Sequence, residues 1–196
     1  MQSIVENIKN KQLNADVVAV VANTATAQGL VWAQQQGIAT AVVEHKDYTS
    51  RELFDQQLAQ VVASYQPDYV LLAGFMRILT PEFVQQFAGQ LINIHPSLLP
   101  LFPGLNTHQQ ALDAQLQWHG CTVHFVTPVL DHGPIIAQGI VPVHHDDNAD
   151  RLAQRLLQIE HQVYAQVVQW LADDQVQLLD NGWVQVKNQT HRAFVL

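Results

Sequence analysis

The apolar positions of this chain form short continuous runs that alternate with stretches of helical spacing. Apolar residues that recur every three or four positions predict helices, and short apolar runs bounded by turn residues predict strands. Ser50 is a predicted N-cap, and Pro81 suits the first turn of a helix. In chain order we expect helix 3–11, strand 16–22, helix 27–36, strand 40–43, helix 51–65, strand 68–73, helix 81–87, strand 91–95, helix 107–114, strands 120–127 and 135–143, helix 148–171 and a hairpin over 176–186.

This alternation predicts an α/β fold. We expect a doubly wound, mostly parallel sheet with helices on both faces. Because no helix is predicted between 120–127 and 135–143, the C-terminal edge of the sheet should be antiparallel. No repeat or Pro/Gly/Ser-rich linker marks a boundary, so residues 1–196 should form a single domain. Such domains usually open with a strand, whereas this chain opens with a helix, so we expect the domain to be N-terminally incomplete.

Composition and charge narrow the expected partners. The net charge of −8 disfavours broad contact with nucleic acid or with an anionic membrane surface. Cys121 is the single cysteine, which excludes an intrachain disulfide and fits a reducing compartment. No leader-like segment is evident, and the longest aliphatic run, 17–22, is too short to span a bilayer. We therefore expect a cytoplasmic protein with neither nucleic acid nor membrane as a partner.

Three polar residues lie at or next to predicted turns, where catalytic and binding residues often occur. Asn93 and His95 are two residues apart on a predicted strand, so their side chains share one face, and Pro96 ends that strand. Asp131 precedes a Gly-Pro turn. If Asp131 folds back beside His95, the imidazole can exchange a proton, the carboxylate can orient it, and the amide can polarise a carbonyl. Since such residues in turns are more often structural, spacing alone leaves both interpretations open.

Other polar groups favour structural interpretations. Residues 144–147, His-His-Asp-Asp, are adjacent on one loop and indicate a polar loop rather than a metal site. His119 and His124 are better explained as hydrogen-bonded structural histidines than as ligands. No metal is therefore expected.

Four blocks carry a resemblance to a known family. They are N-I-H-P-S-L-L-P at 93–100, P-G-L-N-T-H-Q-Q-A-L at 103–112, H-G-C-T-V-H-F-V at 119–126 and L-D-H-G-P-I-I at 130–136. With these blocks the chain resembles the folate-dependent formyltransferases, most closely the members that act on glycinamide ribonucleotide in purine synthesis. The resemblance implies transfer of a formyl group from 10-formyltetrahydrofolate to the amine of glycinamide ribonucleotide, without a metal, by a monomer or homodimer. It implies that Asn93, His95 and Asp131 are the catalytic triplet.

The same resemblance assigns residues to the two ligands. The folate would contact Arg51, Met76, Arg77, Ile78, Leu79 and Asn93. The apolar members suit a flat pterin, and either arginine suits the glutamate tail. Glu160 matches the family position that contacts the amino end of the nucleotide substrate. From the residues alone, an exposed helical arginine, an ordinary core turn and a solvated carboxylate explain these positions better.

Two departures from the family pattern bear on function. The family's first strand and its S-G-x-G-S-N turn, whose amides hold the substrate phosphate, should precede the first helix, where Met1 already stands. We therefore expect poor stability and weak phosphate binding. Asn106 replaces a common histidine and receives no catalytic role. Two alternatives stay open: a formyltetrahydrofolate deformylase, in which water replaces the amine, and a truncated, non-catalytic folate-binding product.

Overall fold

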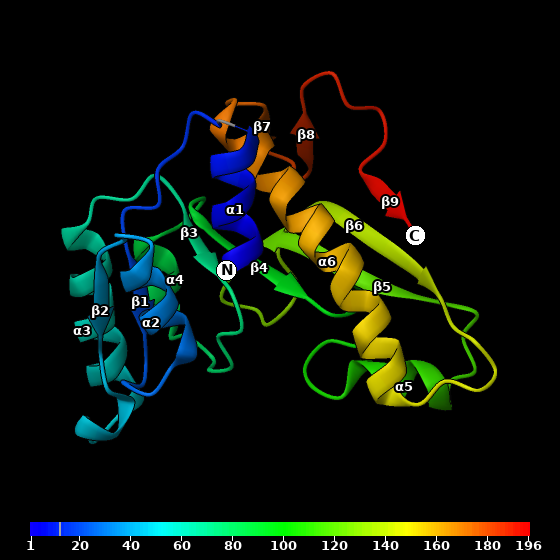
Figure 1. The fold of residues 1–196 in the computed structure, drawn as a ribbon, viewed down its shortest axis with the longest axis horizontal. Helices are drawn as coiled ribbons and strands as arrows, with labels where there is room; N and C mark the ends of the chain where they lie inside the picture. Colours follow the sequence, from blue (N-terminus) through cyan, green and yellow to red (C-terminus); the bar gives the residue numbers. More distant parts are fainter. Residues whose placement is uncertain (12) are drawn as a thin grey trace.

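The computed structural model describes residues 1–11 and 13–196, in which strands and helices alternate (Figure 1). In chain order its elements are α1 (Gln2–Lys11), β1 (Val20–Ala22), α2 (Gln28–Gln35), β2 (Thr40–Val42), the short 3-10 helix η1 (His45–Asp47), α3 (Arg51–Ser64), β3 (Val70–Leu72), α4 (Pro81–Gln86), β4 (Leu91–His95), α5 (Thr107–Asp113), β5 (Trp118–Phe125), β6 (Ile135–Pro142), α6 (Ala149–Ala172), β7 (Val176–Leu178), β8 (Val184–Val186) and β9 (Ala193–Val195). No helix of the described residues is long and apolar enough to cross a membrane.

Side-chain caps start three of the helices where the sequence predicts them. Ser50, Thr80 and Asn148 each accept a hydrogen bond from the backbone amide three residues later, at 3.2, 3.3 and 2.9 Å. Each cap satisfies one of the amides that the first helical turn leaves without a partner. Pro81 follows directly after the Thr80 cap, where its missing N–H costs nothing.

The strands form one five-stranded sheet and two smaller ladders. In the large sheet the order is β3-β4-β5-β6-β9, with parallel pairs β3–β4 and β6–β9 and antiparallel pairs β4–β5 and β5–β6. Strands β1 and β2 pair in parallel as a separate ladder, and β7 and β8 form the predicted hairpin. The α/β fold and the antiparallel pairing of β5 with β6 are confirmed.

Helices cover both faces of the large sheet. On one face α1, α5 and the long α6 pack over Ile92, Cys121 and Val123 (Figure 1). On the other face α3 and α4 pack with Leu91. Because side chains alternate along β4, Asn93 and His95 point to the face of Leu91, opposite α6.

Strands β1 and β3 are shorter than the predicted runs, and one strand of the large sheet is not predicted. Strand β1 covers only Val20–Ala22 of the predicted 16–22 run. Strand β9 is not predicted, and it runs parallel to β6 at the edge of the sheet. Arg192 fixes its start by donating from Nη1 to the carbonyls of Ile135 and Ile136 at 2.8 and 2.9 Å. This strand depends on a partner far away in sequence, so its three residues carry no local signal.

Candidate active site

The end of β4 brings the predicted polar pair into the interior. His95 is buried, and its amide neighbour Asn93 is half-buried on the same face of the strand. The antiparallel ladder with β5 sets Asn93 opposite His124 and His95 opposite Thr122. Side chains that face each other across such a ladder are close enough to interact.

The turn after β4 fixes the proton on one nitrogen of His95. His95 Nε2 lies 2.9 Å from the carbonyl oxygen of Phe102. Because a carbonyl oxygen only accepts, Nε2 carries a hydrogen and donates it. Thr122 holds the turn in place, since its Oγ1 donates to the Ser97 carbonyl at 2.7 Å and accepts from the Leu99 amide at 3.0 Å. The other ring nitrogen, Nδ1, is therefore the one free to exchange a proton.

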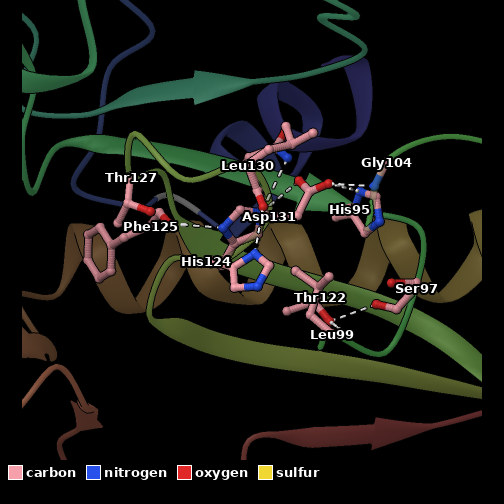
Figure 2. A network of polar contacts seen from close by, with 12 residues as sticks. His95, Ser97, Leu99, Gly104, Thr122, His124, Phe125, Thr127, Leu130 and Asp131 are labelled. Carbon is pink, nitrogen blue, oxygen red and sulfur yellow. Dashed lines mark hydrogen bonds and ion pairs between the residues drawn. The ribbon is translucent and has the colours of Figure 1, made fainter. Parts of the chain in front are cut away.

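Asp131 reaches His95 from the loop between β5 and β6. Its Oδ2 lies 3.5 Å from His95 Nδ1 and accepts the Gly104 amide at 2.8 Å. The Asp131 backbone is left-handed, with φ of 54°, a conformation that Asp, Asn and Gly tolerate better than other residues. Figure 2 shows Asp131 between His95 and His124. The structure thus gathers Asn93, His95 and Asp131 in one buried cluster.

His124 also belongs to this cluster, although the sequence suggests only a structural role for it. Its Nε2 lies 3.3 Å from Asn93 Nδ2 and 4.0 Å from Asp131 Oδ1. Its Nδ1 lies 2.9 Å from the Phe125 carbonyl oxygen (Figure 2). Burial lowers the pKa of His124 from its ordinary value. Strand alternation places His124 and Thr122 on one face, but only the register between β4 and β5 reveals its partner.

Two further histidines, His108 and His119, are in contact with each other near the turn that follows β4. His108 Nδ1 and His119 Nε2 are 3.1 Å apart. Burial, with a smaller contribution from nearby His108 and His95, lowers the pKa of His119 to about 4. In residues 1–11 and 13–196 no group of three or more His, Cys, Asp or Glu side chains is arranged to hold a metal ion.

The segment predicted to contact folate begins beside Asn93. Leu72, the last residue of β3, is paired in register with Asn93. Beyond it, the side chains of Met76 and Ile78 are 77% and 57% exposed. The guanidinium of Arg77 lies 5.1 Å from the centre of the Phe54 ring on α3. Leu79 packs into the core on the α3 side, and Arg51 is exposed at the start of α3.

Glu160 is separate from this cluster. It lies on α6, which covers the opposite face of the sheet, and no hydrogen bond or ion pair among the described residues joins it to Asn93, His95 or Asp131. Burial raises the pKa of its carboxyl group. The structure therefore places Glu160 apart from the other predicted site residues.

Comparison with known proteins agrees with this geometry. Residues 1–168 match the family model described as formyl transferase. The chain belongs to the formyl transferase family. Phosphoribosylglycinamide formyltransferase of Escherichia coli (strain K12) is 46% identical to this chain over 182 residues. The match covers 93% of this chain and 86% of the relative. The human trifunctional purine biosynthetic protein adenosine-3 is 41% identical, but the match covers only 18% of its length.

Solved structures of formyl transferases share the fold. Phosphoribosylglycinamide formyltransferase from Coxiella burnetii superposes with a TM-score of 0.90 at 38% identity, covering 98% of this chain and 92% of the other. A formyltetrahydrofolate deformylase from Pseudomonas syringae pv. tomato gives a TM-score of 0.84 at 29% identity, covering 94% of this chain and 61% of the other. The scaffold therefore occurs both in proteins named as transferases and in one named as a hydrolase.

Proposed function

We propose that this protein transfers the formyl group of 10-formyltetrahydrofolate to the amine of glycinamide ribonucleotide, a step of purine biosynthesis. The observation that carries the proposal is the buried contact of His95 Nδ1 with Asp131 Oδ2, 3.5 Å long, beside the amide of Asn93. The names of the relatives support the choice of both substrates.

Asn93 and His95 suit a carbonyl that becomes negatively charged. When the substrate amine attacks the formyl carbon, negative charge grows on the formyl oxygen. Hydrogen-bond donors that are already fixed in place stabilise that charge without reorganisation. Asn93 offers an amide N–H, and His95 offers a proton at Nδ1 once that nitrogen is protonated, because Nε2 is engaged with Phe102.

Asp131 suits the proton transfer that completes the reaction. The attacking amine must lose a proton, and the leaving folate nitrogen must gain one. Asp131 Oδ2 faces His95 Nδ1, so the carboxylate can accept a proton from the amine, directly or through water, while it keeps the imidazole oriented. The Gly104 amide holds that oxygen at 2.8 Å, so the carboxylate is positioned before substrate binds.

The surface around the cluster fits a flat, largely apolar ligand with an anionic tail. Exposed apolar side chains lie on the loops that follow β3, β4 and β5: Met76, Ile78, Leu105, Val129 and Leu130. The Nε of Arg77 is buried without a hydrogen-bond partner among the described residues, and its guanidinium lies 5.1 Å from the centre of the Phe54 ring. We assign the folate to this surface, with Arg77 or Arg51 for its carboxylates.

We assign Glu160 to the nucleotide substrate. A carboxylate whose pKa is raised by burial gains from a cationic partner, because the partner offsets the desolvation of the charged form. The resemblance names the amino end of the nucleotide substrate as this partner, although Glu160 lies on α6, on the opposite face of the sheet from the triplet at which that amine reacts.

A deformylase is the second candidate, because the Pseudomonas syringae protein shares the fold. One assay separates the functions: the protein is mixed with 10-formyltetrahydrofolate, with and without glycinamide ribonucleotide, and tetrahydrofolate formation is followed. The transferase predicts turnover only with the amine. Turnover without it would identify a hydrolase, and no turnover in either mixture would favour the non-catalytic alternative.

We also propose that the protein works in the cytoplasm as a monomer or a homodimer and does not bind nucleic acid. The buried, unpaired Cys121 is compatible with a reducing compartment. The net charge of −8 opposes binding to phosphate backbones. Sedimentation velocity in the presence and absence of a DNA duplex tests both the assembly state and the nucleic-acid statement.

A further inference from the structure

We infer that His124 is a positioning residue that fixes which end of the Asn93 amide faces the reacting carbonyl. The inference rests on the proposed formyl transfer, in which an N–H of Asn93 is donated to the formyl oxygen. It starts from the cross-strand pair of Asn93 and His124, whose Nδ2 and Nε2 atoms are 3.3 Å apart.

The tautomer of His124 follows from its two contacts. Its Nδ1 lies 2.9 Å from the carbonyl oxygen of Phe125, which only accepts, so the ring hydrogen is on Nδ1. Burial lowers the pKa of the ring, which favours the neutral form. In that form Nε2 has a lone pair and no hydrogen. Nε2 of His124 is therefore an acceptor directed at Asn93.

This acceptor selects one of the two orientations of the Asn93 amide. With Nδ2 toward His124, one N–H is donated to Nε2 and the second N–H of the same nitrogen stays available. In the flipped orientation, the amide oxygen would face the lone pair of Nε2, and two acceptors would repel each other. A half-buried amide without His124 loses this preference, and molecules with the flipped amide offer an oxygen where a donor is needed.

The surroundings of His124 keep its ring from turning. The side chain is only 2% exposed. Behind it, a Cβ at Gly133 would lie 1.7 Å from the Phe125 carbonyl oxygen, so the returning loop packs directly on the acceptor that fixes the tautomer. The register between β5 and β6 shifts at Val123/His124, and such irregularities re-aim side chains next to sites.

Two substitutions separate positioning from simple packing. His124→Leu fills the space but removes the acceptor, whereas the amide oxygen of His124→Gln reaches about as far as Nε2 and can accept from Asn93. We expect His124→Leu to lower kcat by about 10-fold to 100-fold, with little change in the KM of either substrate. The upper value corresponds to the loss of one fixed hydrogen-bond donor to the transition state. His124→Gln should recover most of that loss. Equal kcat losses in both variants, at equal stability, would overturn the inference.

A double-mutant cycle with Asn93→Ala gives the sharper test. If His124 acts through Asn93, His124→Leu should change kcat less than about twofold in the Asn93→Ala background, because no amide is left to orient. A kcat loss as large as in the wild-type background would overturn the inference. Val123→Ala, a core change on the opposite face of β5, is the matched control that should lower Tm and leave kcat unchanged.

Nitrogen-15 spectra of the imidazole rings report the tautomer without any turnover. The inference requires His124 with a protonated Nδ1 and a bare Nε2 at pH 7, and the opposite tautomer or an imidazolium would refute it. This separates it from the proposed function. A wild-type protein without amine-dependent turnover would reject the function, whereas an active wild type with unaffected His124→Leu would reject only the positioning role.

Discussion

His95 Nδ1 faces Asp131 Oδ2 at 3.5 Å, while the other nitrogen of the same ring donates to a backbone carbonyl. The 3.5 Å separation is longer than a typical N–H···O bond, so this contact leaves Nδ1 available to another acceptor. The Phe102 carbonyl that accepts from Nε2 and the Asp131 carboxylate that faces Nδ1 together fix the orientation of the imidazole. The proposed proton exchange therefore involves Asp131.

Replacement of Asp131 by Asn should abolish most turnover while it preserves the fold. The amide keeps the shape of the side chain and tolerates the left-handed backbone, with φ of 54°. It cannot accept and release a proton at neutral pH, so we expect kcat to fall about 100-fold or more. Steady-state kinetics from pH 6 to 9 check this, and a near-wild-type kcat at every pH would contradict the assignment of Asp131.

Asp131→Ala serves as the control for backbone effects. It removes the carboxylate and also places a residue that disfavours positive φ in the loop. We expect kcat to fall as in Asp131→Asn, together with a Tm below that of Asp131→Asn. If only the alanine variant loses activity, the loop conformation rather than the carboxylate is what catalysis needs.

Glu160→Gln should stabilise the protein at neutral pH and weaken binding of the nucleotide substrate. A raised folded-state pKa means that the folded protein disfavours the carboxylate, so its stabilising contribution is complete at low pH and is lost as pH rises through the folded pKa. The gain in the free energy of unfolding of Glu160→Gln should stay below about 1 kcal/mol, because the Glu160 side chain is only half-buried. Urea unfolding at pH 4 and pH 8 checks the sign: the variant should gain only at pH 8, and KM for the ribonucleotide should rise.

Tyr164→Phe should lower stability more than activity. The Tyr164 hydroxyl donates to the Leu72 carbonyl at 2.9 Å and lies 3.3 Å from the Ile92 carbonyl, which ties α6 to β3 and β4. Burial raises the pKa of this phenol, so it remains a donor. The variant leaves buried carbonyls without this partner, and we expect a loss of about 1–3 kcal/mol. Chemical unfolding measures it, and an unchanged midpoint would show that water replaces the hydroxyl.

The pair of Asp147 and Arg155 predicts a pH-dependent contribution to stability. Arg155 donates to both carboxylate oxygens, at 2.6 and 2.8 Å, and the Asp147 side chain is 2% exposed. Hydrogen bonds from Arg155 lower the pKa of Asp147 from 3.8 to about 2. A lowered pKa stabilises the folded state above pH 4, and this contribution disappears as pH falls toward 2.

Asp147→Asn should therefore lower the free energy of unfolding by on the order of 2 kcal/mol at pH 7, and by progressively less below pH 4. Asp146→Asn is the matched control, since its pair with Arg151 is largely exposed, and it should change stability by less than about 1 kcal/mol. Urea midpoints of both variants between pH 3 and 7 provide the measurement. A constant deficit of Asp147→Asn across that range would contradict the ionic interpretation.

Local signals predicted the elements well, and long-range contacts decided what the sequence left open. The caps at Ser50, Thr80 and Asn148 mark helix starts within their own segments. The pairing of Asn93 with His124 depends on a strand register that brings together two residues 31 positions apart, which no local pattern encodes. Hydrogen bonds to backbone groups are equally hard to predict from the sequence. The Phe102 carbonyl reaches His95 only because the turn after β4 folds back on that strand.

The separate ladder of β1 and β2 has a consequence for local unfolding. Within the described residues, its backbone hydrogen bonds connect β1 only to β2 and the adjoining loops, and Val21 contributes to the core by side-chain packing alone. Opening this ladder breaks no hydrogen bond of the large sheet. Its amide protons should therefore exchange with deuterium faster than those of β4 to β6, and residues 20–42 should open as a unit while the cluster of Asn93, His95 and Asp131 remains folded.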